Sequence, residues 1–122
     1  MSAQPGILLI DDDLGVREGL TYLLSSFAPV WPVDSWNGAL NLLQREPVGL
    51  VVTDYQVCSE EGVDDLVAAI RALGVPMILC TGAHPEELAR ARTMFRPDVL
   101  LGKPFSLDEM MDAVQRLYRK VS

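Results

Sequence analysis

Residues 7–13 read ILLIDDD, four apolar residues in a row followed directly by three aspartates. An apolar run without alternating polar residues is typical of a strand that is buried on both faces of a sheet. The stretch that follows, LGVREGLTYLLSSF at 14–27, has the spacing of an amphipathic helix instead. This change of period predicts the first unit of an alternating strand–helix fold.

The same alternation recurs along the rest of the 122 residues. Each further unit pairs an apolar run with a stretch of helical spacing: 30–33 with 37–46, 49–53 with 62–73, 76–80 with 85–95, and 98–101 with 106–120. Strand–helix alternation implies parallel strands that are joined by right-handed crossovers. We therefore predict a doubly wound α/β fold that forms one domain over residues 1–122, with no output domain.

Local patterns mark where several of these helices begin and end. Pro85 precedes two glutamates, and proline at the first helical position with acids in the first turn is typical of a helix start. Ser106 and Glu109 have the spacing of a capping box. Gly74 and Pro97 predict the ends of the third and fourth helices.

Composition argues against two classes of partner. The formal net charge of -7 does not offer the basic surface that binding to nucleic acid requires. No apolar run reaches the roughly 18 residues of a membrane-spanning helix. The first residues, MSAQPG, lack the basic start and apolar middle of a signal peptide. We therefore expect a cytoplasmic protein that binds neither DNA nor membrane.

Polar residues follow four of the five predicted strands. In an open parallel sheet, ligands bind beyond the carboxyl ends of the strands, close to the point where the strand order reverses. These positions hold Asp11, Asp12 and Asp13 after the first strand, Asp54 after the third, Thr81 and Gly82 after the fourth, and Lys103 and Pro104 after the fifth. We expect most of these side chains to converge at one edge of the sheet.

This set of residues points to phosphoryl chemistry. Clustered carboxylates repel one another, which is tolerable where they share a hard cation, and carboxylate oxygens suit Mg²⁺ or Mn²⁺. A lysine at the same edge can neutralise an incoming anion. Phosphoryl transfer is catalysed mainly by positioning and charge stabilisation of this kind.

The chain resembles the receiver domains of two-component response regulators over essentially its whole length. The resemblance rests on ILLIDDD with Arg17 following, LVVTD at 50–54, Gly62, LCTGA at 79–83 and LLGKPF at 100–105, all in the family's order. It implies a flavodoxin-like sheet of five parallel strands in the order 2-1-3-4-5, with five helices. It also implies a sensor histidine kinase or histidine phosphotransfer protein as phosphoryl donor, and an output domain or effector protein as the target.

Carried onto this sequence, the resemblance makes Asp54 the phosphoacceptor. Asp12 would bind Mg²⁺ directly and Asp11 directly or through water, while Asp54 and the main-chain carbonyl of Gln56 would complete the protein ligands. The only reactions that such a protein catalyses are its own phosphorylation and dephosphorylation. Asp13 is excluded from this site, because it lies at the start of the first predicted helix, where the helix dipole favours a negative charge.

The resemblance also assigns the residues that would hold the phosphoryl group. Lys103 would pair with one phosphoryl oxygen, the Thr81 hydroxyl would donate to a second, and the Gly82 amide to a third. The Lys103-Pro104 bond is a candidate cis peptide, which would aim Lys103 inward.

Three positions in two places depart from the family's pattern. Receivers usually carry Met-Pro three and four residues after the phosphoacceptor, where this chain has Val57 and Cys58. Their aromatic switch residue usually lies three positions before the lysine, where this chain has Leu100. We expect phosphorylation still to draw Thr81 inward and to shift the fourth helix, with Leu100 filling the vacated space.

Two other functions remain open at this point. A pseudo-receiver would keep the fold but signal through partner binding without being phosphorylated. A phosphatase of the haloacid-dehalogenase type would use Asp11, Asp13, Thr81 and Lys103, but that family's later acidic pair is missing and Asp54 would have no role.

We expect a monomer or a weak dimer, and the sequence leaves the choice open. Receivers often pair through the face of the fourth helix, fifth strand and fifth helix, which here includes Arg90, Arg92, Asp112 and Arg116. A solvated helical face explains the same charges.

Overall fold

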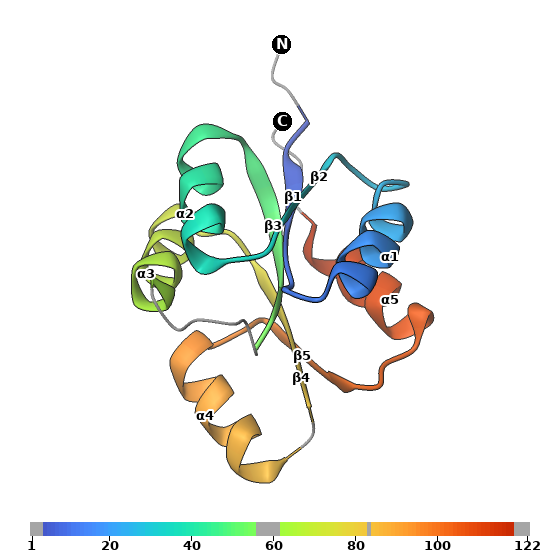
Figure 1. Ribbon diagram of the computed structural model, residues 1–122, viewed down its shortest axis with the longest axis vertical. Coiled ribbons are helices and arrows are strands. Elements are labelled where there is room, and N and C mark those ends of the chain that lie inside the picture. The colour runs from blue at the N-terminus through green and yellow to red at the C-terminus, as the bar shows by residue number, and fades with distance from the viewer. Residues whose placement is uncertain (1–3, 56–61, 83, 119–122) are drawn as a thin grey trace.

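The computed structural model describes residues 4–55, 62–82 and 84–118. Strands and helices alternate along these residues (Figure 1). The strands are β1 (Gly6–Ile10), β2 (Val30–Val33), β3 (Val48–Asp54), β4 (Met77–Gly82) and β5 (Val99–Lys103). The helices are α1 (Leu14–Leu24), α2 (Trp36–Arg45), α3 (Val63–Leu73), α4 (Pro85–Phe95) and α5 (Leu107–Leu117). None of the described helices has both the length and the apolar character that crossing a membrane requires.

The strands form one parallel sheet in the order β2-β1-β3-β4-β5, as predicted. Helices α2, α3 and α4 cover one face of the sheet, and α1 and α5 cover the other (Figure 1). In β1, Leu8 and Ile10 belong to the hydrophobic core between the sheet and α2–α4. Ile7 and Leu9 belong to the core between the sheet and α1 and α5. Burial on both faces explains why these strands are continuous apolar runs.

The predicted helix boundaries at four positions are confirmed. The side chain of Ser106 accepts a hydrogen bond from the Glu109 backbone N–H at 3.1 Å, and the Glu109 carboxylate accepts one from the Ser106 backbone N–H at 3.1 Å. Pro85 is the first residue of α4, which ends two residues before Pro97. Gly74 ends α3 in the left-handed conformation, with φ of 66°, as glycine often does.

Two helices end earlier than their sequence pattern predicts. The pattern runs to residue 27, but α1 ends at Leu24, because Phe27 packs back against the core beside α5. In the same way α5 ends at Leu117, and Tyr118 turns away so that its hydroxyl donates to the Pro5 carbonyl. In both cases the residue that makes the tertiary contact lies within three residues of the helix end.

A close approach between β1 and β2 requires a glycine. A Cβ on Gly6 would lie 2.1 Å from Nε1 of Trp31 and 3.0 Å from the carbonyl oxygen of Pro29. The Trp31 Nε1 atom is itself buried and makes no hydrogen bond in the part of the chain that the structure describes. The indole can therefore lie over the start of β1 only while residue 6 has no side chain.

We predict that Gly6→Ala destabilises the fold, because the added methyl group must displace the Trp31 indole. Overpacking of this kind typically costs about 1–3 kcal/mol, and urea unfolding followed by circular dichroism measures it. Gly102→Ala is the matched control, because a Cβ on this strand residue meets no atom within 4 Å beyond its chain neighbours. We expect the control to change the free energy of unfolding by less than about 0.5 kcal/mol. Equal losses in both variants would contradict the packing argument.

Candidate functional site

The predicted site residues lie at the carboxyl ends of four strands. Strand pairing keeps these ends level: Ile10 pairs with Thr53, Asp54 with Cys80, and Gly82 with Lys103. Asp11 directly follows β1, while Asp54, Gly82 and Lys103 are the last residues of β3, β4 and β5. The sheet therefore brings acids, a lysine and a threonine from distant parts of the sequence to one edge.

Three aspartates form an acidic cluster at this edge. Asp11, Asp12 and Asp54 each offer a carboxylate oxygen, and these oxygens all lie within 4.8 Å of one another. Asp11 is only 3% exposed and Asp54 9%. Like charges this close repel strongly when water is excluded. Three hard oxygen ligands in this arrangement fit a divalent cation.

Asp11 is harder to ionise in the folded protein than in water. Burial raises the pKa of the Asp11 carboxyl above its ordinary value of 3.8, and the charge on Asp54 raises it further. A hydrogen bond from the Asp13 backbone N–H to Oδ1 of Asp11, at 2.9 Å, acts in the opposite direction. The folded chain therefore resists ionisation of Asp11 unless a positive charge joins it.

The turn from β1 into α1 holds Asp11 in place and keeps Asp13 out of the cluster. Arg17 donates from a guanidinium nitrogen to the Asp11 carbonyl oxygen at 2.8 Å. The Asp13 carboxylate accepts from the Val16 backbone N–H at 3.0 Å and caps α1. This confirms the interpretation of Asp13 as a helix-capping residue.

Lys103 supplies a positive charge next to Asp54. Its Nζ atom lies 3.2 Å from Oδ1 of Asp54. Partial burial lowers the pKa of the Lys103 ammonium, but the attraction of the Asp54 carboxylate outweighs this and raises the pKa above its ordinary value. The predicted cis peptide bond between Lys103 and Pro104 is present. Lys103 therefore stays charged at neutral pH.

Thr81 lies at the same end of the sheet, and its hydroxyl bonds to the backbone. The side chain is fully buried, and Oγ1 donates to the carbonyl oxygen of Gly82 at 3.2 Å. Leu100, at the predicted switch position, is half-buried against the core on the α2–α4 face. Gln56, with Val57 and Cys58, lies outside the described residues, so its predicted carbonyl ligand stays a prediction.

An aromatic contact that the sequence analysis missed connects the site to α4. Tyr55 directly follows Asp54, and its backbone N–H donates to the Cys80 carbonyl at 2.8 Å. Its ring lies edge-on to that of Phe95, with centroids 5.8 Å apart, and Phe95 also lies 5.8 Å from Trp36. An aromatic residue directly after a strand-terminal acid was the available signal. The residue beside Asp54 therefore contacts the last residue of α4.

Comparison with known proteins gives a consistent result. The family model of the response regulator receiver domain matches residues 7–115. The chain is 34% identical over 115 residues to the response regulator protein FleR of Pseudomonas aeruginosa, covering 90% of this chain and 24% of that protein. It is 30% identical over 129 residues to the C4-dicarboxylate transport transcriptional regulatory protein DctD of Rhizobium meliloti, covering 98% and 26%.

The chain thus spans about a quarter of the length of these two relatives. Among solved structures, it is similar to the signal receiver domain of an HD domain-containing protein from Pseudomonas fluorescens. The TM-score is 0.81 at 26% sequence identity, and the match covers 93% of this chain and 94% of that one.

We predict that Asp11→Asn stabilises the metal-free protein at neutral pH and abolishes its stabilisation by Mg²⁺. A carboxyl with a raised pKa in the folded state contributes stability below its ordinary pKa of 3.8, and this contribution is lost as pH rises through the raised pKa. At neutral pH the wild type therefore carries an unfavourable charge that asparagine lacks. We expect the variant to melt a few degrees higher in EDTA.

Thermal unfolding in EDTA and in Mg²⁺, at neutral pH and at about pH 4, tests this expectation. The gap between the variant and wild type in EDTA should shrink at the acidic pH. Asp112→Asn, which removes a charge from a side chain that is 70% exposed on α5, should leave the response to Mg²⁺ unchanged. An Asp11→Asn protein that is less stable than wild type in EDTA at neutral pH would contradict the raised pKa of Asp11. A variant that Mg²⁺ stabilises as much as wild type would contradict a role for Asp11 in binding a divalent cation.

Proposed function

Because this chain belongs to the family of response regulator receiver domains, which act in two-component signalling, we propose that it accepts a phosphoryl group on Asp54. The donor would be a histidine kinase or a histidine phosphotransfer protein. One observation carries the proposal: the Asp54 carboxylate lies in the acidic cluster and, at 3.2 Å, beside the Lys103 ammonium.

A divalent cation, Mg²⁺ or Mn²⁺, fits the acidic cluster. Three carboxylates and the Lys103 ammonium together carry a charge of minus two, which one divalent cation would balance. Asp11, Asp12 and Asp54 would hold it, with the Gln56 main-chain carbonyl as a further proposed ligand. When bound, such a cation supplies positive charge that neutralises phosphoryl oxygens.

The chain's own residues would carry the transfer. An Asp54 oxygen attacks phosphorus as the bond from phosphorus to the donor's histidine nitrogen breaks. The donor ring, which carries a proton on its other nitrogen, leaves as neutral imidazole, and an acyl phosphate remains on Asp54. Lys103, now paired with Asp54, moves to a phosphoryl oxygen. The Thr81 hydroxyl leaves the Gly82 carbonyl and donates to a second oxygen, while the Gly82 N–H donates to a third.

The turn of Thr81 would also start the conformational switch. It frees space at the end of β4, which half-buried Leu100 would fill from the neighbouring strand. Helix α4 is held by few buried residues, Ala91 and Phe95 among those described. Phe95 touches Tyr55, the residue next to Asp54. We therefore propose that α4 moves on phosphorylation and that this contact helps to move it.

The geometry argues against the phosphatase, and the pseudo-receiver needs an experiment. A haloacid-dehalogenase-type phosphatase would need both Asp11 and Asp13 in the site, and the Asp13 carboxylate caps α1 instead. As a receiver domain, the chain is not a conventional enzyme. A pseudo-receiver would keep the fold without accepting phosphate, and the first experiment below distinguishes it.

We predict one Mg²⁺-dependent phosphoryl adduct on the protein after incubation with acetyl phosphate, measured by intact mass. The adduct should be absent from Asp54→Ala. Asp13→Asn is the matched control, because asparagine keeps the α1 cap and removes a charge next to the cluster, so its adduct should form as in wild type. No adduct on wild type, with no response to beryllofluoride, would reject phosphorylation in favour of the pseudo-receiver.

We also predict that beryllofluoride with Mg²⁺, a mimic of the bound phosphoryl group, shifts amide NMR signals in α4 as well as at the acidic cluster. Phe95→Leu should reduce the α4 shifts by about half or more, because leucine loses the aromatic contact with Tyr55. Met94→Leu, at a neighbouring residue that is 41% exposed, should not. Shifts that stay at the cluster in wild type would refute the proposed movement of α4.

A further inference from the structure

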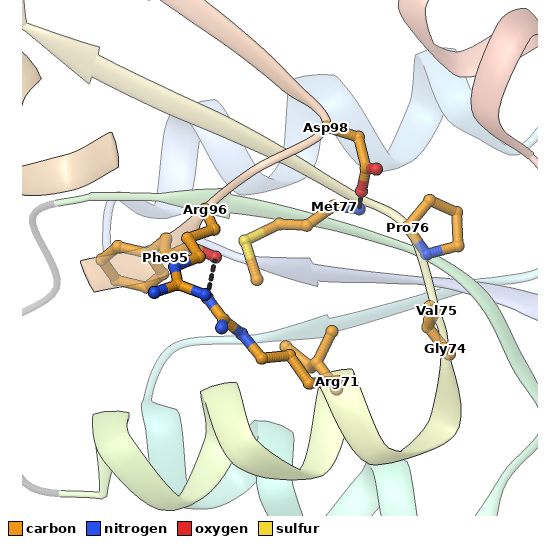
Figure 2. A pocket seen from close by; sticks show the side chains of 9 residues that line it. Arg71, Gly74, Val75, Pro76, Met77, Phe95, Arg96 and Asp98 are labelled. Carbon is orange, nitrogen blue, oxygen red and sulfur yellow. Dashed lines mark hydrogen bonds between the residues drawn. The ribbon is translucent and has the colours of Figure 1, made fainter. Parts of the chain in front are cut away.

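We propose a second ligand site in this protein, at the opposite end of the sheet from the acidic cluster. A cavity of about 340 Å³ opens between the end of α3, the start of β4 and the end of α4 (Figure 2). The geometry assigns it to a small monocarboxylate that carries an apolar group. The volume lies within the range of about 300–1,000 Å³ that is usual for small-molecule sites.

The floor of the cavity is apolar. Ile70, Met77 and Phe95 line it, and each is at most 3% exposed, so their side chains are held in the core. Val75 adds a half-buried side chain at the edge. A ring or short alkyl group placed here would contact mainly Val75, because the three buried side chains expose almost no surface to a ligand.

Two arginines from different elements line the same cavity without ion-pair partners. Arg71 reaches from α3 toward the end of α4, and Arg96 is the residue that caps this end (Figure 2). Within residues 4–55, 62–82 and 84–118, neither guanidinium forms an ion pair. Asp98 also lines the cavity, but its Oδ2 accepts from the Met77 backbone N–H at 2.8 Å. Two positive charges and one negative charge leave the lining at plus one, which suits a monoanion.

Most N–H donors of the two guanidiniums are not bonded to the carbonyls at the helix ends. Arg71 donates one N–H to the Phe95 carbonyl oxygen at 3.2 Å. The Ile70 carbonyl, at the end of α3, accepts instead from the Val75 backbone N–H at 3.2 Å. A guanidinium has five N–H donors, and it binds a carboxylate best through two of them at once. The remaining donors of Arg71 and those of Arg96 can serve a ligand.

The backbone of Arg96 is the second observation that favours a role for its side chain. Arg96 has φ of 46°, and it is the only non-glycine residue with positive φ in the described part of the chain. Gly74 ends α3 in the same left-handed region, which glycine adopts without strain. Helix α4 therefore ends in an arginine in the left-handed conformation that α3 reserves for a glycine. That arginine lines the cavity.

The test is an NMR titration of the full chain with phenylacetate, with phenylacetamide as the neutral probe of the same shape. Phenylacetate should give saturable amide shifts at Val75 and Met77, and phenylacetamide should bind at least tenfold more weakly. Arg96→Gln should weaken phenylacetate binding about tenfold, since it removes one of the two charges that hold the carboxylate. Arg71→Gln should do the same, with circular dichroism to check that α4 remains folded.

The matched control is Arg92→Gln, an exposed arginine of α4 that does not line the cavity, and it should bind as wild type does. Asp54→Ala should also bind normally, so failure of this proposal is distinct from failure of the phosphoacceptor. Absence of saturable shifts at the cavity, equal binding of phenylacetamide, or undiminished binding by Arg96→Gln would each overturn the proposal.

Discussion

The repulsion between three carboxylates is the constraint on which the site depends. Asp11, Asp12 and Asp54 come within a few ångströms of one another because β1 and β3 are neighbours and end level. Their charges can coexist only with positive charge nearby, and the chain provides one such charge, Lys103, from the end of β5. The sheet therefore holds a set of charges with an excess of negative charge, which a divalent cation would balance.

Much of the fold and the site could be predicted from the sequence, because both depend on local patterns. Continuous apolar runs mark strands with two covered faces, and the residues after each run must meet at one edge of a parallel sheet. The direction of the Thr81 hydroxyl and the contact of Tyr55 with Phe95 could not be predicted. They depend on how residues far apart in the sequence pack, as do the ends of α1 and α5, where Phe27 and Tyr118 turn to tertiary contacts.

Phe95 takes part in both ends of the molecule. Its ring touches Tyr55 beside the acidic cluster, its carbonyl accepts from Arg71, and its side chain lines the cavity at the other end. A movement of α4 driven from one end would change the contacts available at the other. Coupling between two sites is reciprocal, so a ligand that holds the end of α4 would alter the phosphorylation equilibrium to the same extent.

The strand order has a consequence for the nascent chain. During synthesis the chain leaves the ribosome from its N-terminal side, and β2, β1 and β3, which are adjacent in the sheet, are complete by residue 54. The three acidic residues therefore emerge well before Lys103 does. Any contact that they make in that interval would lack the Lys103 ammonium, so a cation from solution would have to supply the positive charge that Lys103 supplies in the folded protein.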